Sequence, residues 1–102
     1  MLVRKGPSDE IYAGGDPLVC SAVGSPRRCG GQGDVLSGCL GTMCAWAAMA
    51  GEGADLAGAA YLACSTARRA AARAFARQRR SMVTQDVLGQ LGMAVDELFP
   101  EM

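Results

Sequence analysis

The residues best suited to chemistry form a glycine-rich turn that ends in an acid, Gly30-Gly31-Gln32-Gly33-Asp34. The glycines fall where a loop is expected to become a helix, and glycine lets backbone N–H groups converge without obstruction by a Cβ atom. The positive end of the helix dipole would reinforce this cradle, so a phosphate or a transferring phosphoryl group could bind there. The Asp34 carboxylate could then accept the proton of a hydroxyl that attacks the bound phosphoryl group.

The same turn also has a purely structural interpretation. Short glycine-rich turns are common, and Asp34 would serve as an N-cap because an aspartate side chain accepts hydrogen bonds from first-turn N–H groups. The segment contains neither the G-K-[ST] end of a P-loop nor the G-x-G-x-x-G of a dinucleotide-binding fold. The local pattern is compatible with both interpretations.

A few short strands followed by helices are expected to position this turn. Turn residues bound the candidate strands, which are residues 2–4, 10–13 and 18–23. Glycine punctuation, an N-cap at Asp55 and a stop at Pro100 delimit the candidate helices, which are residues 33–51, 55–80 and 84–99. Three short strands cannot cover three mostly apolar helices, so further strands are expected from elsewhere.

The chain has the size and composition of one small domain. It has 102 residues and 10.5 kDa, half of the residues are hydrophobic, and ten basic residues balance ten acidic ones. Zero net charge argues against a general nucleic-acid binder. Because only 5% of the residues are aromatic, an independent core would be poor in large side chains, which indicates part of a larger unit.

Cysteine and histidine usage excludes several kinds of site. The chain has five cysteines, none in a C-x-x-C pair, so neither a disulfide framework nor a zinc site is expected. This favours a reducing, intracellular compartment. The absence of histidine excludes nucleophiles activated by histidine and leaves acid–base chemistry to carboxylates. Cys29 is expected to be a structural thiol, although two arginines precede it.

The uncharged run at residues 35–51 is interpreted as a buried helix of a water-soluble protein and not as a membrane span. It is slightly short for a span and is diluted with Gly, Ser, Thr and Cys. Its small residues would suit close packing on a neighbouring element; they are Gly38, Gly41, Ala45 and Ala48. No signal or transit segment is expected at the start of the chain.

The second expected helix has a small-residue side and a basic side. The small residues recur at intervals of three and four and are expected to pack on the sheet; they are Ala59, Ala63, Ala67, Ala70 and Ala74. Arg69, Arg73 and Arg77 share one face, within a stretch that also holds Arg68, Arg79 and Arg80. That face is interpreted as solvated, with a binding surface for nucleic acid or an anionic membrane as the alternative.

Three segments together resemble a known family. The run from Arg27 to Asp34, followed by Leu36-Ser37-Gly38, is similar to the Gly-x-Gly-Asp motif of the ribokinase-like fold in its eukaryotic ATP-dependent NAD(P)H-hydrate dehydratase form. Lys5-Gly6-Pro7-Ser8-Asp9 resembles the family's Lys-Gly-x-x-Asp stretch, and the segment beginning Arg80-Ser81 resembles the start of its last helix. Gln85 departs from the small residue usual there.

The resemblance implies an α/β fold, with residues 1–102 as the C-terminal portion of one three-layer ribokinase-like domain whose N-terminal part lies outside this chain. In the family, ATP phosphorylates the hydroxyl of the hydrated nicotinamide ring, and loss of phosphate restores NADH or NADPH. Asp34 would contact the hydrate (NADHX or NADPHX) and act as the base. The implied ATP-binding residues are Lys5, Gly6, Pro7, Ser8, Asp9, Gly24, Ser25, Pro26, Arg27, Arg28, Cys29, Gly30, Gly31, Gln32 and Gly33.

The resemblance also implies Mg²⁺ with the ATP, although no metal ligand is assigned. One of Arg27 and Arg28 would contact nucleotide phosphates. The expected partners are a small-molecule substrate and a nucleotide, without nucleic acid or membrane, and the full-length protein is a candidate homo-oligomer. The cytoplasm or the mitochondrion is the expected location. Two alternatives stay open, namely a related ribokinase-like small-molecule kinase and a non-catalytic helical module that binds through its basic face.

Overall fold

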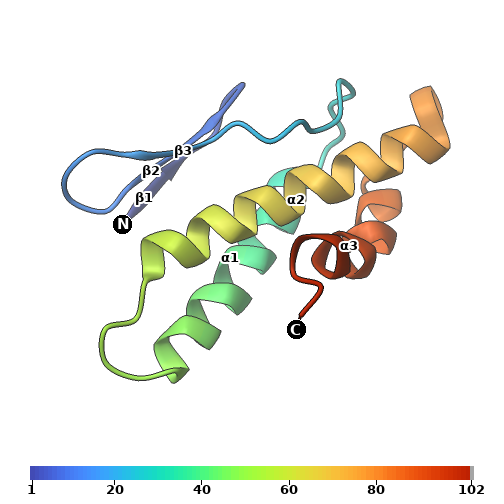
Figure 1. Cartoon of the computed structure of the whole chain (residues 1–102). Helices are drawn as coiled ribbons and strands as arrows, with labels where there is room; N and C mark the ends of the chain where they lie inside the picture. The colour runs from blue at the N-terminus through green and yellow to red at the C-terminus, as the bar shows by residue number, and fades with distance from the viewer. Residues whose placement is uncertain (102) are drawn as a thin grey trace.

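The computed structural model describes residues 1–101 and contains three strands followed by three long helices (Figure 1). The strands are β1 (Leu2–Arg4), β2 (Asp9–Tyr12) and β3 (Leu18–Cys20). The helices are α1 (Gln32–Met49), α2 (Leu56–Gln78) and α3 (Thr84–Leu98), with a short 3-10 turn at Arg79–Ser81 after α2. The predicted α/β class and order of elements are therefore confirmed. β3 ends earlier than expected, at Cys20.

The strands form an antiparallel sheet in the order β1-β2-β3. The register pairs Val3 with Ile11 and Ile11 with Leu18, and the β2–β3 turn contains two glycines with positive φ, Gly14 and Gly15. Ile11 and Cys20 turn inward and are fully buried. They pack with α1 and the N-terminal half of α2 in one of the two core clusters.

Helix α2 is the central element and contacts the sheet, α1 and α3 (Figure 1). Its small residues allow this close approach, but they do not all face the sheet as predicted. Ala60 and Ala63 pack with the sheet residues Ile11 and Cys20, whereas Ala70 and Ala74 pack in a second cluster. The partners in that second cluster are Val35, Met82, Val87 and Ala94. The C-terminal half of the stripe therefore joins α2 to α1 and α3.

Most of α1 is not buried, in contrast to the prediction. Val35 and Leu36 are its buried residues, while Trp46 and Met49 are largely exposed. The four small residues predicted to pack closely are exposed as well; they are Gly38, Gly41, Ala45 and Ala48. Pattern alone could not show which elements are available to cover them. No helix within residues 1–101 is long and apolar enough to cross a membrane.

Gly31 fixes the entry into α1. It is the N-cap residue with φ 96°, a left-handed conformation that glycine adopts without strain. A Cβ atom there would lie 3.3 Å from Cγ2 of Thr84, at the start of α3. The turn therefore requires glycine at this position both for its backbone angle and for its contact with α3.

We expect Gly31→Ala to lower the free energy of unfolding by about 1–2 kcal/mol, because the alanine must hold a left-handed backbone angle. Gly30→Ala is the matched control, since Gly30 has no positive φ and open space where its Cβ would be. Urea unfolding of the two variants measures the difference. Equal unfolding midpoints would show that the turn does not depend on the conformation of Gly31.

Candidate functional site

The glycine-rich turn presents the open end of α1. The helix begins at Gln32, and no side chain caps its N-terminus. The N–H groups of the first turn have no partner within a helix, so here they are available to an anion. Thr84 Oγ1 donates a hydrogen bond to the carbonyl oxygen of Gly30, which ties the turn to the start of α3. A contact from a distant helix therefore holds the turn on which the predicted anion cradle depends.

A cleft of about 870 Å³ lies beside this turn. It brings together most of the residues predicted to bind ATP, from the two predicted stretches, residues 5–9 and 24–33. Those that line it are Lys5, Gly6, Pro7, Asp9, Gly24, Ser25, Pro26, Arg28, Cys29, Gln32 and Gly33. The predicted residues that do not line it are Ser8, Arg27, Gly30, Gly31 and Asp34. A second cavity, of about 710 Å³, is mainly apolar and contains none of the predicted residues.

Lys5 connects these two stretches. Its exposed side chain places Nζ 3.9 Å from the position that a Cβ atom on Gly33 would take. An ammonium group thus lies beside the first turn of α1, where the helix dipole is also positive. The two positive groups face the same region of the cleft, which favours a ligand with negative charge.

The residues just before the glycines have different roles. Arg27 Nε donates to the carbonyl oxygen of Met82 at 2.7 Å, and the Cys29 thiol donates to the same oxygen at 3.2 Å. These contacts fasten the loop to the segment before α3 and agree with the structural role predicted for Cys29. Arg28 lines the cleft and is exposed. Of the two arginines, Arg28 is therefore the one placed to contact a ligand.

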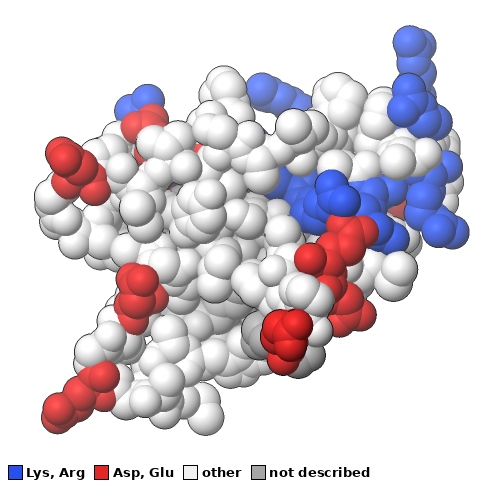
Figure 2. Space-filling view, in the orientation of Figure 1, with Lys and Arg blue, Asp and Glu red and all other residues white. Residues whose placement is uncertain are grey.

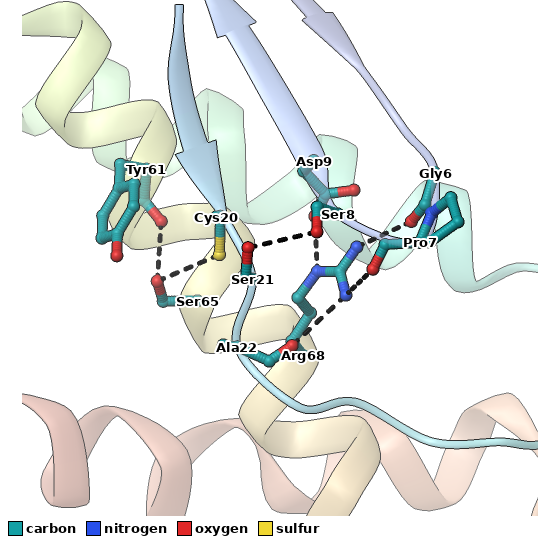
Figure 3. Close-up of polar contacts among 10 residues, drawn as sticks. All are labelled: Gly6, Pro7, Ser8, Asp9, Cys20, Ser21, Ala22, Tyr61, Ser65 and Arg68. Carbon is teal, nitrogen blue, oxygen red and sulfur yellow. Dashed lines mark hydrogen bonds and ion pairs between the residues drawn. The ribbon is translucent and has the colours of Figure 1, made fainter.

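Asp9, which begins β2, is buried and faces an arginine of α2 (Figure 3). Its Oδ2 accepts a hydrogen bond from Arg68 Nε at 2.8 Å, and both side chains are largely shielded from solvent. Burial by itself raises the pKa of the Asp9 carboxyl, but the hydrogen bond and charge of Arg68, together with Gly6 and Lys5, hold that pKa below its usual value. Asp9 therefore lines the cleft as a carboxylate whose charge is already paired with Arg68.

Asp34 stands apart from the buried pair. It lies in the first turn of α1 and is exposed, and no hydrogen bond from its side chain occurs within residues 1–101. The interpretation of Asp34 as the N-cap is wrong, because Gly31 occupies that position. Its neighbours Gly33 and Val35 line the cleft, but Asp34 does not.

Two residues of this region were not predicted from the sequence. Arg68 was assigned to the solvated side of α2, but it lines the cleft and reaches four acceptors. Arg68 follows the buried Cys64 by four residues and precedes the buried Ala71 by three, which places it on the inner face of the helix. This spacing was the sequence feature that could have indicated its position. Thr84 was predicted only as the first residue of a helix, and nothing in its sequence context pointed to Gly30.

The basic side of α2 is largely engaged by acidic partners. Arg69 and Arg73 both pair with Glu97 of α3, and Arg73 also donates to Gln90. Figure 2 shows blue and red side chains in contact where α2 meets α3, with further arginines toward the end of α2. The outer face is solvated as predicted, but two of the three arginines that define it are not free.

Comparison with known proteins decides the family. Residues 1–92 match the family described as NAD(P)H-hydrate dehydratase. This chain belongs to that family. The match includes all three segments on which the resemblance was based, and the small sheet with three helices is consistent with the C-terminal part of a ribokinase-like fold.

Individual relatives of the family agree. The ATP-dependent (S)-NAD(P)H-hydrate dehydratase of Homo sapiens is 44% identical over 103 residues, which cover 96% of this chain and 30% of the human protein. The protein of the same name from Dictyostelium discoideum is 38% identical over 110 residues, covering 98% of this chain and 36% of its own length. The chain thus spans about a third of the length of the curated relatives it matches.

Proposed function

We propose that this chain takes part in the ATP-dependent dehydration of hydrated NADH or NADPH, the repair reaction that gives its relatives their name. The main support is the cleft beside α1, which gathers residues from both stretches expected to bind ATP, residues 5–9 and 24–33. Residues 1–102 would be the C-terminal portion of one ribokinase-like domain. ATP and the hydrate are the proposed small-molecule ligands.

The glycine turn and Lys5 would hold the phosphates of ATP. The open N–H groups of the first turn of α1 and its dipole would face the transferring phosphoryl group, with Lys5 Nζ beside them. The helix backbone fixes the N–H groups before any ligand arrives, which is what makes such stabilisation effective. Arg28 would add a second positive charge on the wall of the cleft.

Asp34 would act on the hydrate. Its carboxylate would accept the proton of the ring hydroxyl while the hydroxyl oxygen attacks the terminal phosphorus of ATP and ADP leaves. An in-line transfer of this kind would place the attacking hydroxyl and the leaving ADP on opposite sides of the phosphorus.

Magnesium would enter with the ATP phosphates. Residues 1–101 contain no group of three His, Cys, Asp or Glu side chains that could hold a metal ion. Mg²⁺ usually keeps several waters and binds through substrate phosphates and one or two carboxylates, so it needs no protein cage. Of the described residues, Asp9 is the one carboxylate that lines the cleft and is already paired with Arg68, so the phosphates of ATP would carry the ion, which would neutralise charge on the transferring phosphoryl group.

The basic face of α2 supports the interaction-module alternative less well. Glu97 neutralises Arg69 and Arg73, which leaves Arg77 as the unpaired member of that face among the described residues. Exposed pairs of this kind contribute little to stability, but they reduce the charge available to a nucleic acid or a membrane.

The free state of all five cysteines supports an intracellular compartment.

The proposed function is tested by measuring ATP-dependent recovery of NADH from its hydrate. We expect recovery to require both ATP and the hydrate. ATP turnover without any need for the hydrate would instead identify a related small-molecule kinase. Salt-sensitive binding to RNA that is lost when Arg69, Arg73 and Arg77 are all changed to Glu would favour the interaction module.

A further inference from the structure

Arg68 reaches from the middle of α2 to the chain segments that form the cleft wall (Figure 3). Its four hydrogen bonds join segments far apart in the sequence. Nε donates to Asp9 Oδ2 at 2.8 Å, and Nη2 donates to the carbonyl oxygen of Gly6 at 2.8 Å. Nη1 donates to the carbonyl oxygens of Pro7 at 3.0 Å and Ala22 at 3.2 Å. One side chain therefore fixes the β1–β2 turn and the chain that leaves β3.

These bonds leave Arg68 little capacity to bind a ligand itself. A guanidinium group has five N–H donors, and the four hydrogen bonds use all but one of them. Its positive charge is also paired with the buried Asp9 carboxylate. Any influence of Arg68 on a nucleotide must therefore pass through the residues it holds.

Arg68 touches both of the stretches expected to bind ATP, residues 5–9 and 24–33. It bonds Gly6, Pro7 and Asp9 of the first stretch. Its aliphatic stem covers Gly24 of the second, because a Cβ atom on Gly24 would lie 3.7 Å from Arg68 Cγ. The neighbour of Gly6 is Lys5, whose Nζ approaches Gly33. Arg68 thus holds the backbone next to the residue whose ammonium group approaches the glycine turn.

We propose that Arg68 is a positioning residue of the nucleotide cleft, which holds the Lys5-bearing turn against the Gly24 segment and thereby sets ATP affinity. The proposal rests on the proposed binding of ATP. A lysine at this position could supply the charge, but its single ammonium group cannot reproduce the planar fork that spans these acceptors. The geometry of the guanidinium, and not only its charge, should therefore matter.

The test is the affinity of the purified chain for ATP with Mg²⁺, measured by titration calorimetry, for the original protein, Arg68→Lys and Arg68→Met. Small displacements of positioning groups can lower a reaction rate about 100-fold. For a displaced binding cleft, we expect Arg68→Met to bind ATP at least about ten-fold more weakly than the original protein. Arg68→Lys should fall between the two. A partial recovery of ATP affinity in Arg68→Lys, relative to Arg68→Met, would not follow from a loss of folding alone.

Two further variants separate positioning from stability. Arg68→Met combined with Asp9→Asn removes the buried charge that the single change would leave unpaired, and we expect this double variant to fold and still bind ATP weakly. Arg73→Met is the matched control, because Arg73 lies on the same helix but pairs with Glu97 and Gln90 of α3. It should lose stability without losing ATP affinity.

The outcomes distinguish the positioning role of Arg68 from the proposed function on which it rests. If the folded Arg68 variants bind ATP as tightly as the original protein, the positioning role is overturned while the proposed function stands. An equal loss of affinity in Arg73→Met would also overturn it, because the effect would then be general. If the original chain binds no ATP, the proposed function fails and the positioning role fails with it.

Discussion

Asp34→Asn is expected to lower the rate of ATP-dependent recovery of NADH from its hydrate by about 10²–10⁴-fold, the usual contribution of a general base. The amide has nearly the shape of the carboxylate but cannot accept the hydroxyl proton. Asp34 is exposed and makes no hydrogen bond within residues 1–101, so the fold should tolerate the change. The loss of its charge near the helix N-terminus should cost only about 0.3–1 kcal/mol.

Asp86→Asn is the matched control for this change. Asp86 occupies the first turn of α3, as Asp34 does in α1, and its Oδ2 accepts a hydrogen bond from the N–H of Val83 at 2.8 Å. The control should lose at least as much stability while keeping the rate of NADH recovery. ATP affinity should change little in either variant, because neither side chain lines the cleft. Equal rates of NADH recovery for Asp34→Asn and the original protein would show that Asp34 is not the general base.

The positions of the elements could be predicted because local chemistry determines them. Asp55 was expected to cap the second helix, and its Oδ1 does accept a hydrogen bond from the N–H of Gly58 at 2.8 Å. The third helix begins at Thr84 and ends before Pro100 as expected. The start of α1 was missed by only one or two residues, because Gly31 in a left-handed conformation replaces the expected aspartate cap.

Contacts between distant segments could not be predicted in the same way. The pairing of Asp9 with Arg68 spans 59 positions, and no periodic pattern identifies which acid an arginine will meet. The exposure of α1 has a similar origin. Its apolar, small-residue composition predicts burial, but burial also needs a neighbouring element, and the three strands lie against α2 instead.

The candidate site falls between these two cases. The glycine turn and Asp34 were located by their order and spacing, since the turn and the helix start are adjacent in the sequence. The closeness of Lys5 to Gly33 was implied only by the family resemblance. Arg68 and Thr84, which hold the cleft and the turn in place, became visible only once the helices were packed.

Asp9→Asn is expected to cost about 3–5 kcal/mol of unfolding free energy at neutral pH, the usual penalty for removing one partner of a buried ion pair. Asp9 is 3% exposed, and its carboxylate balances a guanidinium that is itself mostly buried. Glu10→Gln is the control on the same strand. Glu10 pairs with the exposed side chain of Arg4, and such pairs contribute only about 0–1 kcal/mol.

The same pair predicts how stability depends on pH. Asp9 has a pKa below its ordinary value of 3.8, because Arg68, Gly6 and Lys5 favour the carboxylate more than burial opposes it. A carboxyl group whose pKa is lower in the folded state stabilises the fold above its unfolded pKa and loses that contribution as pH falls through the folded pKa. The nearby Cys64 thiol does not titrate in this range, since burial and then Asp9 raise its pKa to about 12.

Urea unfolding across the acid range should therefore show the original protein losing stability below about pH 4, as Asp9 takes up a proton. Asp9→Asn should lose less over the same interval, so the two curves should converge toward low pH. A constant gap between the original protein and Asp9→Asn at every pH would show that the Asp9 carboxylate contributes packing alone. In that case the charge of Arg68 would be balanced by the carbonyl oxygens of Gly6, Pro7 and Ala22 instead.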